Sequence, residues 1–495
     1  MSTPATKARR PERGEEIELS IDSLAHGGEG VARFGEEGYV VFVAGAIPGD
    51  RVRAFVHKRK RAYAHARTVE ILAPGPERIA AKAAHPGVAW QVLPYERQLA
   101  IKHEQVQDAL RRIGHLDGFE MQEIVPAKQQ WRYRNKLEYS FGSGPGGELV
   151  CGFHAPAGWN RVVAIEDCLL ASELGNRARD IALGWALAQG LGPWERAVGP
   201  AIQDPDSEQA SPAPHRRRHE QPDARTGPGP DGRARLRNLV VREGRRTGKL
   251  QIRLVSTPGD LEIESFAAAL VCALGEEAVS GVLWTQTRSV AESTGGGVTE
   301  LVWGESQLPE RLGELDLRIS PQAFFQTNTE MAEVLYGIAA DYAALSGYER
   351  VFDLYCGTGT IALTLAPRAG ELWGIEVVPE AVHDADAAAK RNGVQGARFL
   401  TGDARLVLPQ LLEQAGRPDV VVIDPPRAGL SQKVVRRIID SQPKRIVYVS
   451  CNPTTLAPNA AQLTEAGWRL TTVRPVDMFP QTHHVECVAL LQRDG

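Results

Sequence analysis

The chain has 495 residues, of which 43% are hydrophobic and 24% are charged, a globular balance that excludes a wholly disordered or collagen-like chain. Its length predicts roughly three domains. The formal net charge is −4, from 57 basic and 61 acidic residues, which argues against a histone-like polycation but allows a local basic surface. Six cysteines are too few for a disulfide scaffold and are typical of a reducing compartment.

The N-terminal sequence, MSTPATKARRPERGEE, lacks the apolar run of a signal peptide. No segment reaches the ~20 consecutive apolar residues that cross a bilayer. The sequence therefore predicts a cytoplasmic protein with no membrane partner, and we expect a monomer.

Residues 14–73 predict a small β-barrel, because short runs rich in β-branched and aromatic residues alternate with turns such as HGGEG and FGEEG. From Arg51 to Arg67 the chain has seven Lys or Arg residues, no acid, and the aromatic residues Phe55 and Tyr63. Positive charge with aromatic rings suits single-stranded nucleic acid, through phosphate attraction and base stacking. The alternative is a solvated basic edge that only prevents strand pairing.

Residues 76–315 show a mixed α+β pattern. The segment 95–114 has the apolar spacing of a helix, and 237–256 alternates like a β-hairpin around a Gly-containing turn. Residues 199–233 are rich in Pro, Gly and charge and poor in aliphatic side chains. We predict that they form a disordered insertion.

Strand and helix patterns alternate from residue 316 to 495. The apolar runs ERVFDLYCG, ELWGIEV, ARFLTGDA and DVVVIDPP are each followed by a helical stretch. This order is typical of a doubly wound parallel sheet, which binds ligands at the carboxyl ends of its strands. The predicted fold class is α/β: a Rossmann-like domain preceded by an OB-like β-barrel and a mixed α+β domain.

Residues at three predicted strand ends indicate a nucleoside cofactor. Gly357 and Gly359 lie in the turn of DLYCGTGTIAL, and Asp403 closes the third strand. Glu376 ends the second strand about 20 residues after the turn, where an acid typically binds ribose hydroxyls. A lone Gly turn fits any α/β crossover, but the three features together favour a cofactor. Because G-T-G lacks the pyrophosphate-binding G-x-G-x-x-G pattern, S-adenosylmethionine fits better than NAD.

Three further polar residues lie at later strand ends. Asp424 belongs to the DPPR loop, whose prolines predict a rigid active-site turn, and Cys451 belongs to SCNPTTL. A cysteine on a polar loop at a strand tip favours a nucleophile over a buried structural thiol. Glu486 begins the last strand and is either a general base or an acid at a sheet edge.

Together these strings resemble the RNA (uracil-5-)-methyltransferase family, in particular the branch that modifies 23S ribosomal RNA. DLYCGTGTIAL, DPPRAGL, YVSCNPTTLA and DMFPQTHHVE occur in the family's order, and WRYRNKLEYSFG and SPQAFFQTN resemble further family segments. The resemblance implies three domains. They are a TRAM-like RNA-binding barrel (14–73), a central RNA-binding domain (76–315) and an S-adenosylmethionine-dependent methyltransferase domain (316–495).

The resemblance also implies residue roles, with Cys451 as the catalytic nucleophile, Glu486 as the general base and Asp403 at the adenine. The positions expected to bind S-adenosylmethionine are Gln326, Tyr355, Glu376 and Asp424. Uracil C5 is a weak nucleophile, so attack of the thiolate at C6 first creates an enolate whose C5 can take the methyl group. The base then removes the C5 proton and the cysteine is released. The target uridine must be flipped out of a helix or lie in a loop.

The chain departs from the family pattern in its cysteines. Many members hold an iron–sulfur cluster with four cysteines, three of which precede a helix. The matching stretch here, residues 80–99, contains no cysteine, and only Cys168 matches the fourth position. One thiolate cannot hold a cluster that needs four. We therefore predict no iron–sulfur cluster and no other metal, with Cys168 as a buried structural cysteine.

Two alternatives stay open. A tRNA (uracil-5-)-methyltransferase would use the same chemistry on another RNA, although the N-terminal barrel favours the ribosomal branch. A non-catalytic RNA-binding or chaperone protein would function without Cys451. A cytosine-5 RNA methyltransferase is disfavoured, because it would have a Pro-Cys pair where this chain has DPPR.

Overall fold

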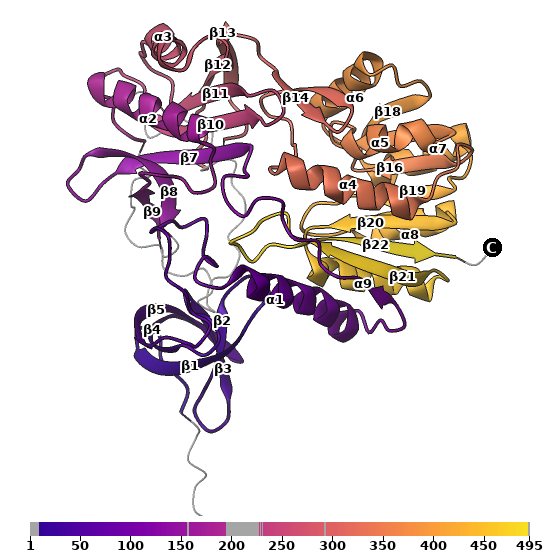
Figure 1. The fold of residues 1–495 in the computed structure, drawn as a ribbon, viewed down its shortest axis with the longest axis horizontal. Coiled ribbons are helices and arrows are strands. Elements are labelled where there is room, and N and C mark those ends of the chain that lie inside the picture. Colours follow the sequence, from indigo (N-terminus) through magenta and orange to yellow (C-terminus); the bar gives the residue numbers. More distant parts are fainter. Residues whose placement is uncertain are drawn as a thin grey trace, which may run out of the picture. The chain divides into compact units, whose positions relative to one another are not determined.

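The computed structural model describes residues 9–155, 158–194, 227, 229, 231–291 and 294–493. They form two compact units (Figure 1). The first contains residues up to 133, 312–317 and 323 onward, and the second contains 134–311 and 318–322. Most of the predicted insertion 199–233 lies outside the described residues. In the described part of the chain no helix is long and apolar enough to cross a membrane.

The first unit begins with a closed five-stranded barrel in the order β1-β2-β3-β5-β4. Its strands are β1 (Glu16–Leu24), β2 (Gly30–Phe34), β3 (Tyr39–Ala44), β4 (Arg51–Arg59) and β5 (Tyr63–Ala73). Alternate side chains such as Val41, Val52 and Ala66 are fully buried and fill the interior. The period-2 alternation explains why so short a segment closes on its own core, and the predicted small barrel is confirmed.

The second unit is built on a seven-stranded sheet in the order β13-β12-β11-β10-β7-β8-β9. The strands are β7 (Lys136–Ser143), β8 (Leu149–Ala155), β9 (Gly158–Ala164), β10 (Leu236–Gly244), β11 (Lys249–Ser256), β12 (Val279–Gln286) and β13 (Val298–Gly304). Two helices, α2 (Glu173–Ala188) and α3 (Ile263–Leu274), belong to the same unit. β10 and β11 form the antiparallel hairpin predicted for 237–256.

An eight-stranded sheet dominates the rest of the first unit, in the order β18-β17-β16-β19-β20-β22-β21-β6. Its strands are β6 (Glu120–Met121), β16 (Arg350–Leu354), β17 (Glu371–Glu376), β18 (Ala397–Thr401), β19 (Val420–Ile423), β20 (Arg445–Ser450), β21 (Arg469–Val476) and β22 (Glu486–Gln492). β16 to β20 are parallel, and β22 is antiparallel to β20 and β21. β19 is buried at every residue, as expected for a parallel strand covered on both faces.

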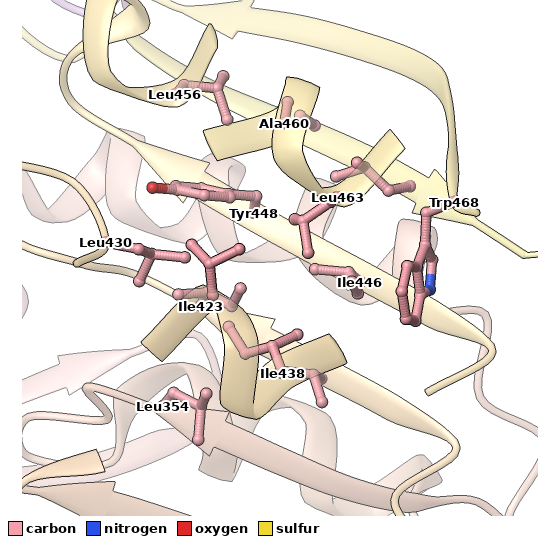
Figure 2. Close-up of a cluster of buried hydrophobic side chains, with 14 of the residues drawn as sticks. Leu354, Ile423, Leu430, Ile438, Ile446, Tyr448, Leu456, Ala460, Leu463 and Trp468 are labelled. Carbon is pink, nitrogen blue, oxygen red and sulfur yellow. The ribbon is translucent and has the colours of Figure 1, made fainter. Parts of the chain in front are cut away.

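Helices alternate with these strands, which confirms the predicted α/β class. They are α4 (Thr329–Ala343), α5 (Thr360–Leu365), α6 (Pro379–Arg391), α7 (Ala404–Ala415), α8 (Gln432–Ser441) and α9 (Pro453–Glu465). Figure 2 shows α8 and α9 packed on one face of the sheet, where Ile438 and Leu463 contact strand residues such as Ile446. Burial of such side chains stabilises the fold by ~2 kcal/mol each.

Residues 76–133 group with this sheet rather than with the seven-stranded one. They include α1 (Tyr95–Asp108) and a π-helical turn (Ala109–Ile113) that ends at Gly114. Val106 and Leu110 are fully buried in the core of the eight-stranded sheet. The shorter elements of the chain are β14 (Leu308–Leu312), β15 (Leu315–Ile319) and a 3-10 turn (Ala366–Arg368).

Candidate active site

The turn after β16 leaves open space next to its backbone. Gly357 and Gly359 have φ values of +55° and +78°, a conformation that glycine adopts without steric cost. A Cβ on Gly359 would lie 2.9 Å from Cβ of Ala385, so only glycine fits there. A Cβ on Gly357 would meet nothing within 4 Å. Tyr355 also has a positive φ of +68°, which costs ~1–3 kcal/mol and is typical of functional sites.

Glu376, at the end of β17, lies against this turn. Its Oε2 accepts a hydrogen bond from the Gly357 amide at 3.1 Å, and its Oε1 accepts from the amides of Val377 (2.7 Å) and Val378 (2.9 Å). These three amides fix the carboxylate at the sheet edge. A carboxylate has about four lone-pair sites, so one is left for a ligand hydroxyl.

Asp403 lies at the neighbouring strand end and caps α7, where its Oδ1 accepts from the Arg405 amide at 2.8 Å. Burial raises the pKa of Tyr355, and the charges of Asp403 and Glu376 raise it further. The structure therefore brings together three residues predicted for cofactor binding: Tyr355, Glu376 and Asp403.

Two exposed apolar residues flank these acids and escaped the sequence reasoning. Val377, directly after Glu376, is 62% exposed, and Leu406, one helical turn after Asp403, is 58% exposed. Apolar side chains beside a few fixed polar groups are typical of small-molecule sites. Their signal in the sequence would have been an apolar residue one to three positions after each strand-end acid.

The pairing of β20 with β22 brings Cys451 and Glu486 to the same end of the two strands. The strands pair antiparallel up to Ser450 and Cys487, so Cys451 directly follows this last pair on β20 and Glu486 directly precedes it on β22. Glu486 is only 3% exposed, whereas Cys451 is partly accessible. The structure thus brings together the predicted nucleophile and the predicted base.

Burial and neighbouring charges raise the pKa values of the acidic groups at this site. Burial, followed by the charges of Glu486 and Asp424, raises the pKa of Cys451 to about 11, although the Arg427 cation lowers it. Burial and Asp424 also raise the pKa of Glu486 well above its ordinary value. Burial raises the pKa of Asp424 itself to about 7. At neutral pH the Cys451 thiol is therefore protonated before a substrate binds.

Two buried polar residues missed by the sequence reasoning adjoin this site. Asp353, on β16, is fully buried, and its pKa is raised well above the ordinary value by burial and then by Asp424. The hydroxyl of Tyr336, on α4, lies 3.2 Å from Oγ1 of Thr360, and burial and Asp424 raise the pKa of this tyrosine. Asp353 stands inside the DLYCGTG string and could have been noticed, whereas only the packing of α4 places Tyr336.

Hydrogen bonds join the loops that surround Cys451. Asn452 caps α9 by accepting from the Thr454 amide at 3.1 Å, and its Nδ2 donates to the Arg427 carbonyl at 3.1 Å. The Arg427 guanidinium lies 3.3 Å from Nδ1 of His484. Arg427 belongs to the DPPR string but has no role predicted from the sequence, and its charge favours the thiolate of Cys451.

Gln326 is the last of the residues predicted to bind the cofactor. The hydrogen bonds of its neighbour Asn328 fix the segment that contains it. It is 5% exposed in the segment before α4. Asn328 caps α4 through the Met331 amide at 3.2 Å and donates to the Met478 carbonyl at 2.9 Å. Gln326 therefore lies on a segment tied to the loop that leads to Glu486.

The predicted absence of a metal stays a prediction. In the parts of the chain that the structure covers, no group of three or more His, Cys, Asp or Glu side chains could hold a metal ion. Cys168 is fully buried, as expected, and its amide donates to Oδ1 of Asn176 at 2.8 Å. In the cysteine-free stretch 80–99, the Gln91 side chain accepts from the Lys82 amide at 2.9 Å.

Comparisons with known proteins show the family of this chain. The family model for the TRAM domain matches residues 10–69, and the model for tRNA (Uracil-5-)-methyltransferase matches 412–494. An uncharacterized RNA methyltransferase of Halalkalibacterium halodurans is 33% identical, with 97% of each chain covered. One of Chlorobaculum tepidum is 34% identical, with both chains covered in full. The chain belongs to the RNA (uracil-5-)-methyltransferase family.

A solved structure shares the fold of this methyltransferase. The tRNA (uracil-54, C5)-methyltransferase of Pyrococcus abyssi, crystallised with S-adenosyl-L-homocysteine, matches with a TM-score of 0.70 at 24% identity. The match covers 96% of this chain and 100% of the other. The two chains therefore share one fold over nearly their whole length.

Proposed function

We propose that this methyltransferase transfers a methyl group from S-adenosylmethionine to C5 of a uridine in 23S rRNA, through a covalent bond between Cys451 and C6. The supporting observation is that Cys451 and Glu486 directly adjoin the last pair of β20 and β22, and that Asp424 directly follows the neighbouring strand β19. A nucleophile and a base side by side are what formation and release of a covalent adduct require.

The residues at the cofactor edge fit S-adenosylmethionine. Glu376 would accept the ribose hydroxyls, Asp403 would contact the adenine, and Val377 and Leu406 would cover the ring. Tyr355, Gln326 and Asp424 are proposed to bind the rest of the molecule. The open space beside Gly357 allows a close approach to the backbone. When bound, S-adenosylmethionine supplies an electrophilic methyl group.

The reaction makes and then breaks the bond between Cys451 and C6. The Cys451 thiol gives its proton to water, the thiolate attacks C6, and the electron pair of the C5–C6 double bond becomes available at C5, which takes the methyl group with S-adenosylhomocysteine as the leaving group. The Glu486 carboxylate then accepts the C5 proton, the double bond reforms and the S–C6 bond breaks. Arg427 assists by favouring the thiolate.

The barrel surface supports RNA as the substrate. The Phe42 and His65 rings are stacked at 5.3 Å between centroids, the Tyr63 ring lies 5.6 Å from that of Phe42, and Arg67 lies over Phe55 at 5.0 Å. Five of the seven cations from Arg51 to Arg67 are exposed. Aromatic rings among cations suit unpaired bases, as a flipped or looped uridine requires.

The test is to map 5-methyluridine in rRNA and tRNA from cells that lack this protein, and to complement them with the wild type or with Cys451→Ala. We expect loss of one or more 23S rRNA positions, restored by the wild type only. Loss from tRNA alone would favour the alternative substrate, which the tRNA enzyme of similar fold also suggests. An unchanged map in both RNAs would exclude the proposed activity.

A further inference from the structure

We infer that α1 positions the general base, through a polar stripe formed by Tyr95, Gln98 and Lys102. This inference rests on the proposed function, in which Glu486 removes the C5 proton. The three residues are spaced i, i+3 and i+7, so they share one face of the helix. That face contacts residues 477–481, the first part of the loop that joins β21 to Glu486.

The first contact is a buried ion pair. Nζ of Lys102 lies 2.6 Å from Oδ1 of Asp477, and both side chains are fully buried. Nζ also donates to the Phe479 carbonyl at 3.1 Å, and the Tyr95 hydroxyl donates to Oδ2 of Asp477 at 2.8 Å. Asp477 directly follows Val476, which is the ladder partner of Glu486. The ion pair therefore holds the residue next to that partner.

The second contact is a reciprocal pair of hydrogen bonds. Nε2 of Gln98 donates to Oε1 of Gln481 at 2.8 Å, and the Gln481 amide donates to Oε1 of Gln98 at 2.9 Å. The Gln481 carbonyl accepts from the Trp90 amide at 3.0 Å. Gln481 has a φ of +66°, which a residue with a side chain keeps only where its surroundings hold it.

These contacts are better suited to positioning Glu486 than to stabilising the fold alone. Residues 477–485 contain neither helix nor strand, so backbone pairing does not fix their path. A buried ion pair loses much of its attraction to desolvation, and an apolar pair of the same size would stabilise the fold equally well or better. Directional polar groups, in contrast, hold one backbone path, and Glu486 lies at the end of it.

The chemistry separates positioning of the base from other roles. If only proton removal is slowed, Cys451 still attacks C6 and C5 is still methylated, but the S–C6 bond cannot break. The methylated RNA then stays attached to the protein and is seen as a denaturant-resistant complex. A defect in folding or RNA binding would instead lower complex formation and turnover together.

The experiment compares two variants of the same helix. Gln98→Met keeps the length of the side chain but removes its hydrogen bonds to Gln481, and Gln107→Met is the control. Glu486→Gln serves as the reference for loss of the base. Each protein is incubated with substrate RNA and S-adenosylmethionine, and turnover, KM for RNA, the melting temperature and the denaturant-resistant complex are measured. For Gln98→Met we expect turnover about 10- to 100-fold lower, a KM within about twofold of the wild type, and accumulation of the methylated complex. Gln107→Met should behave as the wild type does.

The outcomes keep the two proposals apart. If Glu486→Gln accumulates the complex and Gln98→Met does not, the inference about α1 is wrong and the proposed mechanism stands. If Glu486→Gln accumulates none, the proposed role of the base fails first. If Gln98→Met does not fold, Tyr95→Phe removes a single hydroxyl from the same stripe. In that case a stable Tyr95→Phe protein with wild-type turnover and no complex would overturn the inference.

Discussion

At the residue scale, burial among carboxyls explains how the free protein would keep Cys451, the proposed nucleophile, unreactive. The pKa of Cys451 is raised to about 11, so little thiolate exists at neutral pH. A thiol in this form is protected from oxidation and alkylation. Reactivity must then arise when the substrate enters and changes the surroundings of the sulfur.

The pH dependence of Cys451 alkylation in the free protein should reflect this raised pKa. Between about pH 8 and 10 the rate of iodoacetamide modification at Cys451 should rise about tenfold per unit, because the thiolate fraction does. Arg427→Gln should lower the rate about two- to fivefold at fixed pH, since it removes a nearby exposed positive charge. Mass spectrometry of the peptide measures both, with the exposed Cys272 as the internal control. An unchanged rate in Arg427→Gln would contradict the assigned influence of this cation.

Glu376 offers a second prediction at this scale. Glu376→Ala should weaken binding of S-adenosylhomocysteine about 10- to 100-fold, because hydrogen bonds to a charged group contribute ~1.5–3 kcal/mol. Isothermal titration calorimetry measures the affinity. Glu380→Ala, an exposed acid in the first turn of α6, is the control and should leave it unchanged. Equal affinities for both variants would remove Glu376 from the cofactor site.

At the element scale, tight turns set the side chains at the carboxyl edge of the sheet. Gly429, in the DPPRAGL turn, has a φ of +72°, and a Cβ there would lie 2.8 Å from Oδ1 of Asn459. That same oxygen accepts from the Leu430 amide at 2.8 Å and from the Tyr448 hydroxyl at 3.0 Å. The turn that carries Asp424 is therefore locked onto α9.

Gly429→Ala should destabilise the protein by ~1–3 kcal/mol, from backbone strain and displacement of Asn459. Gly337→Ala is the matched control, because a Cβ at this position of α4 meets nothing within 4 Å. A helical glycine replaced by alanine should stabilise by ~0.5–1 kcal/mol. Chemical denaturation of both variants measures the difference, and destabilisation of the same size in both would refute the steric explanation.

At the scale of the whole molecule, a net charge of −4 conceals a basic surface on the barrel. The cations on β4, β5 and the turn between them lie close together, while acids are spread over the rest of the chain. Phosphate attraction acts over about 10 Å at ordinary ionic strength, so local charge matters more than the total. RNA binding by this protein should therefore depend strongly on salt.

The double variant Arg59→Gln and Arg61→Gln tests this surface. If each cation neutralises one phosphate, the slope of log K against log salt should fall by ~1.4 for the pair, on single-stranded RNA. Lys433→Gln with Arg436→Gln removes two exposed cations from α8 and should leave the slope unchanged. Fluorescence anisotropy at several salt concentrations measures the slopes, and identical slopes for the two double variants would exclude the barrel cations from RNA binding.

Some features followed from local sequence because they depend only on local physics. The run of β-branched and aromatic residues in β3 predicts a strand, and the Gly357 turn after an apolar run predicts a strand-to-helix crossover. Glu376 and Asp403 could be predicted at one edge because parallel strands end on the same side of a sheet. The family strings were equally readable, since the residues of each string are contiguous.

Only the tertiary structure shows the contacts between residues that are distant in the chain. From the sequence, Glu486 is either a base or an acid at a sheet edge, and only the pairing of β20 with β22 brings it to the strand end that Cys451 follows. The buried pair of Lys102 and Asp477 joins residues that are 375 positions apart, and no local pattern reports such a contact. The sequence by itself thus determined the fold class and the residues available for chemistry. Packing and strand pairing determined which of these residues lie close together and which of them have raised pKa values.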